Sequence, residues 1–462
     1  MAGIGFALER LARRGHLTGV STAYFHAAFL TVGPWIFTAL AVAGMSAMAG
    51  EATNGDMKVF RTVLIYNFVF SLVLTGPIAL PLTRFVSDEI YARRNGAISS
   101  ALTVALGLFA LLGFAIVAPV YISAPDLSPQ TKLAAHTNFM LIGACWIIVP
   151  MLGALNGYKA VSVAFLCAMT VALVTTALTT ERTPLALLIN YNLALAAALV
   201  LLASRFARAY GTDFQFEKRL LTPYVTYWEL PAIGLAYNLG IWADKIVMWI
   251  AAPTAAGAAG WFPTMPDYDA VMFWAQLTAI PVIAVFFVDI EPEFYRLYRR
   301  FYFCFEERAS LREAVERMEK LGAFTLRSVI RLLAVGAAIA LTSIIASYPA
   351  IEYLGLRPGQ AGMLRTALIG VVFQTAGMFC LCFLLYFDLR RQALAAVAIF
   401  ALMNGSLTAV LLPLGPAFYG YGYLFSTLIS FIAALLLLMR ELPWLHYHAF
   451  VTNNAGSRSS AR

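Results

Sequence analysis

The sequence predicts an all-α polytopic membrane protein with twelve transmembrane helices in two six-helix lobes, and three observations support this prediction. Of 462 residues, 61% are hydrophobic and only 12% are charged, with a mean hydropathy of +0.78. The apolar residues form long runs, and lysine and arginine gather on alternate segments between those runs. A soluble globular chain averages roughly 45–50% apolar and about 25% charged residues. The composition therefore excludes a soluble enzyme, a nucleic-acid-binding protein and a disordered scaffold.

Twelve apolar runs are long enough to cross a membrane as helices. A hydrocarbon core about 30 Å thick takes about 20 predominantly apolar residues in a helix. Barrel strands would show alternation over about ten residues, and the sequence lacks it. The predicted spans, in chain order, are 21–48, 61–86, 97–122, 132–157, 160–180, 184–206, 229–252, 269–288, 322–348, 361–386, 392–412 and 417–440.

The distribution of lysine and arginine predicts the orientation of the chain. Cytoplasmic segments of membrane proteins carry an excess of both residues. Of the 32 cations, 25 lie in or at the ends of the segments before the first span and after every even-numbered span, six lie on the other side, and Lys245 lies within a span. Both termini are therefore expected in the cytoplasm. The same bias explains the net charge of +8, which thus does not indicate a nucleic-acid partner.

A charged segment divides the twelve spans into two sets of six. Segment 208–228 holds five charged residues and predicts a cytoplasmic linker between an N-lobe, 21–207, and a C-lobe, 229–440. Two such halves suggest internal duplication, a common plan in membrane transporters. Gly33-Pro34-Trp35 and Gly240-Ile241-Trp242 lie 207 residues apart, in the first span of each half. This match fits duplication, although chance matching in an aromatic-rich chain is the alternative.

Segments outside the spans are expected at both ends and in the second half. Residues 1–20 predict an amphipathic cytoplasmic segment, and 441–462 a cytoplasmic tail that is partly disordered. Residues 289–321 predict an amphipathic helical insert, because apolar residues recur there at three- and four-residue steps. Its apolar stripe consists of Phe294, Leu297, Phe301 and Phe305. The insert either lies on anionic lipid, or it docks a cytoplasmic partner or covers the cavity.

The charged residues placed deepest in a span are Asp244 and Lys245. They lie roughly fifteen residues into the seventh span, about 22 Å along the helix at the 1.5 Å rise per residue. A charge in hydrocarbon costs at least about 2.5–3.5 kcal/mol unless it faces a bundle interior or water. We expect Asp244 to be a cavity carboxylate that contacts a cationic or hydroxylated substrate or an ion, with Lys245 as its counter-charge. The alternative has Lys245 snorkelling to the outer interface and Asp244 pairing with another helix.

Other polar residues crowd into the first, second, seventh and eighth spans. Each one alone is more often a hydrogen bond between helices, worth about 0.6 kcal/mol on average. Their crowding predicts a shared cavity, since these four helices would face each other in a two-lobed transporter. The members are Glu229, Asn238, Asp269, Gln276, Asn67, Tyr24 and His26, with Asn190, Asn192, Gln374 and Asn404 as further candidates. Helix bends are expected at Gly33, Pro34, Gly76 and Pro77, because proline removes a backbone bond.

No catalytic or cofactor motif is expected. None of the five histidines has a serine, cysteine or carboxylate at a recognisable motif spacing, and no G-x-x-x-x-G-K phosphate loop occurs. The five cysteines have no zinc-ligand spacing. We therefore predict no enzyme activity, no metal and no cofactor, and the energy for transport would come from an ion gradient, substrate synthesis or partners.

Several motifs together resemble the PelG family of exopolysaccharide transporters over nearly the whole chain. The matching residues are Gly3-Ile4-Gly5-Phe6-x-Leu8, Gly33-Pro34-Trp35, Trp242-Ala243-Asp244-Lys245 and Glu291-x-Glu293-Phe294-Tyr295. The resemblance implies a fold like that of the MOP flippase superfamily, with two lobes around a cavity that opens alternately to each side. It also implies export of Pel, a polymer rich in galactosamine and N-acetylgalactosamine, across the bacterial inner membrane.

The resemblance further implies partners, and other functions stay open beside it. The implied partners are a cytoplasmic Pel synthase glycosyltransferase, inner-membrane Pel proteins including a cyclic-di-GMP receptor, and membrane lipid. An ion-coupled antiporter of small cations or drugs, or a flippase for a lipid-linked oligosaccharide, would also fit carboxylates within the membrane. A membrane polymerase or ligase is disfavoured because the predicted outward segments are all short, about twenty residues or fewer. A structural scaffold would tolerate the loss of every intramembrane charge.

Overall fold

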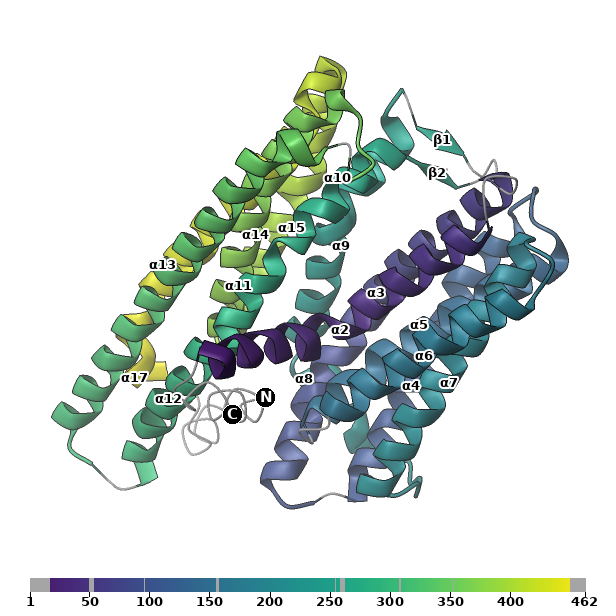
Figure 1. Ribbon diagram of the computed structural model, residues 1–462. Coiled ribbons are helices and arrows are strands. Elements are labelled where there is room, and N and C mark those ends of the chain that lie inside the picture. Colours follow the sequence, from purple (N-terminus) through teal and green to yellow (C-terminus); the bar gives the residue numbers. More distant parts are fainter. Residues whose placement is uncertain are drawn as a thin grey trace. The chain divides into compact units, whose positions relative to one another are not determined.

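The computed structural model consists almost entirely of helices joined by short turns (Figure 1). It describes residues 17–49, 54–94, 96–154, 158–253, 255–257, 262–306, 309–351 and 353–448. The first half contains α2 (Leu17–Ala49), α3 (Asn54–Tyr91), α4 (Gly96–Ile122), α5 (Pro129–Ala154), α6 (Tyr158–Leu178), α7 (Pro184–Tyr210), η2 (Lys218–Leu220), α8 (Thr222–Thr226), α9 (Glu229–Ala251), β1 (Ala256–Gly257) and β2 (Pro263–Thr264).

The second half of the chain begins after a two-residue antiparallel pairing of β1 with β2. It contains α10 (Pro266–Leu277), α11 (Ala279–Val285), the π-helical turn η3 (Phe286–Ile290), α12 (Glu291–Glu306), α13 (Leu311–Ala350), η4 (Pro358–Gln360), α14 (Ala361–Tyr386), α15 (Arg390–Leu411), η5 (Leu412–Leu414), η6 (Pro416–Phe418), α16 (Tyr421–Glu441), η7 (Leu442–Trp444) and α17 (Leu445–Tyr447).

The predicted membrane class is confirmed. Within the described residues, ten helices are long and apolar enough to cross a membrane, and they coincide with the predicted second to sixth and eighth to twelfth spans. The predicted first span coincides with α2, whose described apolar part is Trp35–Ala49. The predicted seventh span coincides with α9, which carries three charged residues and is not among the ten. The count of twelve and the cytoplasmic termini stay predictions, and residues 1–16 and 449–462 lie outside the described residues.

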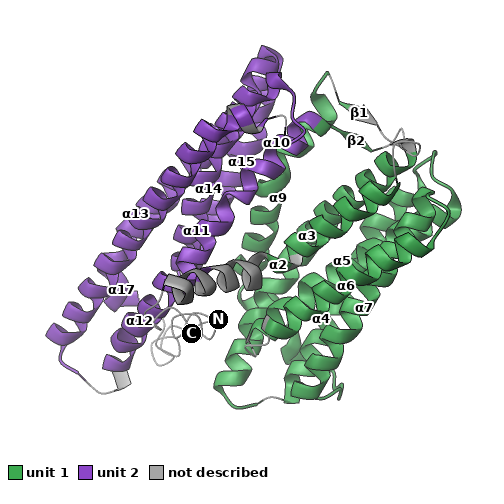
Figure 2. Cartoon of the chain, in the orientation of Figure 1, with its two compact units in different colours: residues 1, 29–266 green, residues 2–28, 267–462 purple. Residues whose placement is uncertain are grey.

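The chain forms two compact units, which Figure 2 colours separately. Unit 1 contains residues 29–266 and unit 2 contains residues 267–462 together with 2–28. In unit 1, α3 packs against α4, α5 and α9, and α7 packs against α5 and α6. In unit 2, α14 packs against α13 and α16, and α16 packs against α15. The helix α9 thus packs with the first half of the chain, although it follows the linker predicted at 208–228 and belongs to the predicted C-lobe. The boundary between the predicted lobes at this linker stays a prediction.

Capping residues set several of the helix ends. Thr183 accepts a hydrogen bond from the Ala186 amide at 3.3 Å, and a proline at the next position starts α7 with its fixed backbone angle. Gly211, with φ of 78°, ends the same helix. Ser310 accepts from the Glu313 amide at 3.3 Å and starts α13. These caps satisfy backbone groups that a helix end leaves unpaired.

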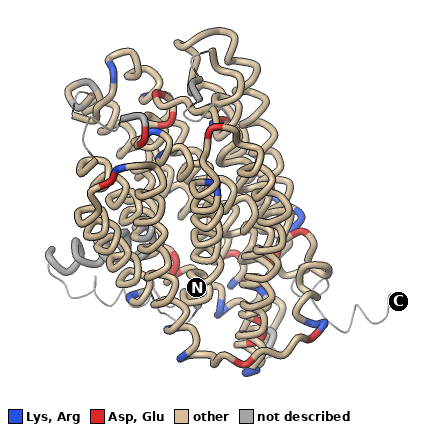
Figure 3. Tube along the Cα trace, turned by 90° about the vertical axis from the view of Figure 1, so that its right-hand side faces the viewer, with Lys and Arg blue, Asp and Glu red and all other residues tan. Residues whose placement is uncertain are grey.

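Exposed side chains identify lipid-facing surfaces. Large apolar residues are exposed along the long helices, for example Leu111 at 66%, Val200 at 66% and Ile345 at 70%. In Figure 3 the charged residues gather mainly near helix ends, with few along the middle of the long helices. Exposed apolar surface of this extent is unfavourable in water and favourable in lipid. The exposure and charge patterns therefore both fit a multi-pass membrane protein.

Candidate functional site

Asp244 and Lys245 on α9 form a buried ion pair in unit 1. The Asp244 side chain is 0% exposed and the Lys245 side chain 11% exposed. The Lys245 ammonium lies 3.3 and 3.4 Å from the two Asp244 carboxylate oxygens, and it donates to the Ile241 carbonyl at 3.2 Å. The two predicted residues therefore pair with each other, and Lys245 does not snorkel away. Pairing lowers the cost of burying either charge, because an isolated buried ion is far more expensive.

A cluster of aromatic rings begins at the Asp244–Lys245 pair. The Lys245 ammonium lies 5.6 Å from the centre of the Trp242 ring, within the range of a cation–π interaction. Trp242 lies 6.2 Å from Trp249, whose ring lies 5.0 Å from Tyr66. Phe262 lies 4.7 Å from Tyr66. The Trp242 indole nitrogen is buried, and among the described residues it has no hydrogen-bond acceptor. Trp242 thus places one ring face and one unused donor beside the charged pair.

Two glycines bring α3 and α9 into backbone contact. A Cβ built on Gly76 would lie 2.4 Å from the Gly234 carbonyl oxygen, and one on Gly234 would lie 2.0 Å from the Gly76 carbonyl oxygen. Asn238 donates to the Gly234 carbonyl at 2.9 Å at the same crossing. Small residues allow such close approach between membrane helices. Gly76 therefore has a packing role, and the bend predicted at Gly76-Pro77 stays a prediction in a helix that continues from Asn54 to Tyr91.

Asn67 is the centre of a buried hydrogen-bond network in unit 1. Its amide donates to Asn138 at 2.9 Å and to the Ala135 carbonyl at 3.0 Å, and it accepts from the Tyr121 hydroxyl. Asn138 in turn donates to Asn192 at 2.8 Å. The side chains of Asn67 and Asn138 are both 0% exposed. Asn67 thus joins α3, α4 and α5, and its side-chain hydrogen bonds are made to the two neighbouring helices.

We expect Asn67→Ala to destabilise the protein more than Tyr121→Phe. The alanine leaves the buried Tyr121 hydroxyl and the Asn138 amide oxygen without their partner, at a cost of about 1–3 kcal/mol. Tyr121→Phe removes a single hydrogen bond, worth about 0.6 kcal/mol on average in membrane proteins. Thermal unfolding of the two purified variants in detergent measures the difference. Equal small shifts would show that Asn67 does not hold the network together.

In unit 2, the predicted residue Gln276 belongs to a second polar network. Its amide donates to Gln374 at 2.7 Å and to the Tyr423 hydroxyl at 3.2 Å, and Tyr423 also donates to Gln374. Nearby in sequence, Ser426 donates to Asn404 at 3.0 Å. These contacts join α10, α14, α15 and α16. The further candidates Gln374 and Asn404 therefore lie in helix-to-helix contacts.

Tyr24 lies in a polar cluster whose other members are far from it in the sequence. Its hydroxyl donates to an Asp289 carboxylate oxygen at 2.9 Å, and Arg331 of α13 pairs with the same oxygen. Asp289 lies within the π-helical turn η3. Turns of this kind are rare and occur frequently at functional sites. The predicted eighth span ends at residue 288, which places Asp289 in the predicted insert. Its position directly after an apolar run is the feature of the sequence that points to it.

Two of the remaining predicted residues lie at helix starts. Glu229 begins α9, and Asp269 lies in the first turn of α10. A carboxylate there is stabilised by the positive end of the helix dipole, so a structural role is sufficient for each. The side chains of His26 and Pro34 lie outside the described part of the structure, and Gly33 is buried beside Phe37.

The expected docking stripe of the insert is largely inside the protein, which corrects that prediction. Phe294 is 1% exposed and Phe301 is 0% exposed. The Phe294 ring lies 4.9 Å from Phe383 and 5.1 Å from Tyr386 of α14. Leu297 is half-buried, and the side chain of Phe305 lies outside the described residues. The amphipathic period was right, but its apolar face packs against the chain's own helices and leaves the basic face outward.

Several solved structures of similar fold are MATE or MOP superfamily transporters. An inward-facing multidrug resistance MATE family transporter of the MOP superfamily matches with a TM-score of 0.61 and 14% identity, over 89% of this chain and 95% of that chain. An outward-facing one matches with a TM-score of 0.63 and 13% identity, over 96% and 99%. A MOP superfamily transporter from Pyrococcus furiosus, described as having a binding pocket of reverse polarity, matches with a TM-score of 0.65 and 11% identity. The match covers 96% of this chain and 98% of that chain. The fold is therefore that of a MOP superfamily transporter.

The family model described as PelG, putative exopolysaccharide exporter (EPS-E), matches residues 1–450. The chain therefore belongs to the PelG family of exopolysaccharide exporters, as its motifs predicted. Family and fold together identify a multi-pass inner-membrane transporter rather than an enzyme. Comparison with curated protein sequences gives no significant match.

Proposed function

We propose that the protein exports a cationic polysaccharide rich in galactosamine and N-acetylgalactosamine across the cytoplasmic membrane, through a central cavity between its two lobes. The match of residues 1–450 to the exporter family carries this proposal. A cationic polymer needs a negative or aromatic contact within the membrane, where an uncompensated charge is costly. Asp244 and the adjacent aromatic cluster would supply both contacts.

The geometry around Asp244 supports an exchange of ammonium groups. Its distances of 3.3 and 3.4 Å to the Lys245 ammonium exceed the roughly 2.7–2.9 Å of a strong charge-assisted hydrogen bond. A substrate ammonium can therefore compete with Lys245 for the carboxylate. The face of Trp242 would hold the same ammonium by a cation–π interaction, and its indole nitrogen would donate to a sugar hydroxyl. When no substrate ammonium is bound, the Lys245 ammonium balances the negative charge of the Asp244 carboxylate.

The proposed partners follow from the chemistry of the polymer and from the family. A cytoplasmic glycosyltransferase must synthesise the chain that the transporter receives. Other inner-membrane Pel proteins, including a cyclic-di-GMP receptor, would join transporter and synthase in a regulated complex. Docking would use the exposed face of α12 or other cytoplasmic segments, since Phe294 and Phe301 are buried.

Removal of the transporter gene from a producing strain tests the proposal. We expect secreted hexosamine, measured after acid hydrolysis of the medium, to fall to background and to return on complementation. A dye-transport assay with the purified protein in vesicles under a pH gradient is the counter-experiment. Normal secretion in the deletion strain, or gradient-driven dye uptake with no effect on hexosamine, would contradict the proposal and favour a drug antiporter like the multidrug resistance transporters of the same fold. Accumulated lipid-linked oligosaccharide in the deletion strain would instead favour a flippase.

A further inference from the structure

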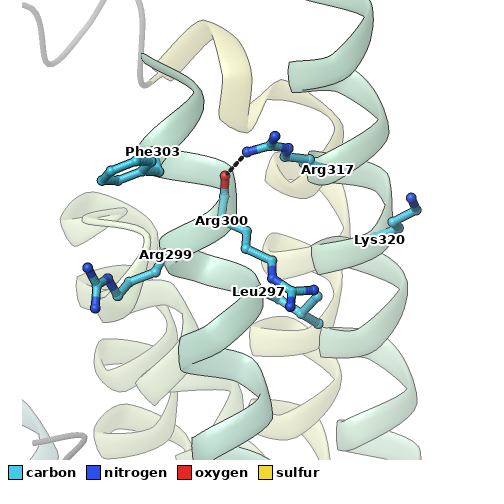
Figure 4. A pocket seen from close by; sticks show the side chains of 6 residues that line it. All are labelled: Leu297, Arg299, Arg300, Phe303, Arg317 and Lys320. Carbon is cyan, nitrogen blue, oxygen red and sulfur yellow. Dashed lines mark hydrogen bonds between the residues drawn. The ribbon is translucent and has the colours of Figure 1, made fainter. Parts of the chain in front are cut away.

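A basic pocket lies between α12 and α13 in unit 2 (Figure 4). Its volume is about 470 Å³, enough for a phosphate group and part of its organic substituent. The lining consists of four cationic and two apolar side chains: Arg299, Arg300, Arg317, Lys320, Leu297 and Phe303. None of the described residues that line it is a carboxylate. The side chain of Arg300 reaches into the space between the two helices, as Figure 4 shows.

Among the residues that the structure describes, most of the cations in this pocket have no acidic partner. Arg317 pairs with Glu313 and donates to the Arg300 carbonyl at 2.9 Å, which fixes its position. Among the described residues, no carboxylate lies within ion-pair distance of Arg299, Arg300 or Lys320. Like charges held near one another repel, and an anion bound between them removes the repulsion. The pocket is therefore electrostatically suited to an anion.

Its place along the chain puts the pocket at the end of a membrane span. α13 contains 40 residues and is thus about 60 Å long, twice the roughly 30 Å thickness of the hydrocarbon core. Its predicted span is 322–348, so Arg317 and Lys320 lie just before the apolar part of the helix. The half-buried Leu297 and the 43% exposed Phe303 add apolar surface beside the cations. Cations beside apolar surface at this depth match a lipid headgroup with its glycerol and upper acyl carbons.

We propose that this pocket binds a phosphate-bearing anion, supplied by the headgroup of an anionic membrane lipid such as phosphatidylglycerol. The arginine and lysine side chains hold the phosphate oxygens, and Leu297 and Phe303 contact the glycerol region. Lipid bound there would fix α12 against α13 at the membrane surface. This role is separate from the transported substrate, since it involves none of the intramembrane polar residues.

Native mass spectrometry of the full-length protein with added phosphatidylglycerol or phosphatidylcholine tests the proposal. The variant is Arg300→Gln/Lys320→Gln, and the matched control is Arg205→Gln/Lys218→Gln, two exposed cations elsewhere in the chain. Each cation near an anionic surface contributes about 5-fold in affinity, so we expect about a 30-fold loss of phosphatidylglycerol binding in the variant. Phosphatidylcholine binding and the control are expected to stay unchanged.

Three outcomes would overturn the lipid assignment. Equal phosphatidylglycerol binding by the variant and the wild type would remove the pocket from lipid recognition. Full displacement of the lipid by millimolar inorganic phosphate would identify a soluble phosphate compound as the ligand. Intact lipid binding combined with lost co-purification of the cytoplasmic synthase would identify the basic face as a protein-docking surface. Unchanged thermal unfolding of the variant is the check that it folds, since both substituted side chains are exposed.

Discussion

Asp244→Asn is expected to reduce polysaccharide export by about 30-fold or more at matched protein level. Loss of one partner of a buried charge pair commonly costs about 2–5 kcal/mol in binding, and each 1.4 kcal/mol is about tenfold. The asparagine side chain keeps nearly the shape of the aspartate but cannot balance an ammonium within a site that is 0% exposed. Secreted hexosamine per unit of transporter in the membrane measures the effect.

A second variant separates the transport role of Asp244 from its structural role. Asp244→Asn leaves Lys245 buried without its counter-charge, which typically destabilises a protein by about 3–5 kcal/mol. The double variant Asp244→Asn/Lys245→Met removes both charges and should recover most of that stability. We expect the double variant to unfold near the wild-type temperature and still fail to export. Restored export in the double variant would reduce the pair to a structural contact.

An exposed ion pair provides the matched control for these charge changes. Arg84 and Asp88 lie 3.2 Å apart on α3, with side chains 41% and 51% exposed. Exposed pairs contribute about 0–1 kcal/mol, so Asp88→Asn should leave both unfolding temperature and export almost unchanged. An export defect of similar size in Asp88→Asn would show that loss of any acidic residue from these helices is harmful.

The helical membrane fold was predictable because its determinants are local in the sequence. An apolar run of span length has few folded alternatives in lipid, so each predicted span coincides with a helix or, for 269–288, with the consecutive elements α10, α11 and η3. The start of a helix is also predictable where a capping residue precedes it, as Thr183 precedes α7 and Ser310 precedes α13. The close packing of α9 against α3 could not be predicted from local sequence, because it depends on Gly76 and Gly234, which lie far apart in the chain.

The candidate site was predictable in part, for a physical reason. Burial of Asp244 and Lys245 followed from their depth in an apolar run, but their mutual pairing depends on side-chain conformations that spacing alone does not determine. Asn67 and Gln276 were recognised as polar residues within spans, yet their partners Tyr121 and Tyr423 look like ordinary aromatic residues in the sequence. A helical period likewise defines the apolar face of α12 without showing which neighbour covers it, which explains the misassigned docking stripe.

The α3–α9 crossing leads to the second large expected effect, a loss of stability and export in Gly76→Ala and in Gly234→Ala. Each new methyl group would meet a backbone carbonyl at 2.4 or 2.0 Å, and backbone atoms cannot rotate aside as a side chain can. The helices must therefore separate, and overpacking of this kind costs about 1–3 kcal/mol or more. Separation would also displace the part of α9 that carries Asp244. Thermal unfolding and secreted hexosamine measure the two consequences.

Gly107→Ala is the control that isolates the crossing from the general effect of glycine in a helix. Gly107 lies in α4 with no atom within 4 Å of its added Cβ, so alanine should stabilise this helix by about 0.5–1 kcal/mol. The double variant Gly76→Ala/Gly234→Ala should cost less than the sum of the two single variants, because the first methyl group already moves the helices apart. Additive costs would mean that the glycines act independently, and stable single variants would mean that α3 and α9 do not cross at this point.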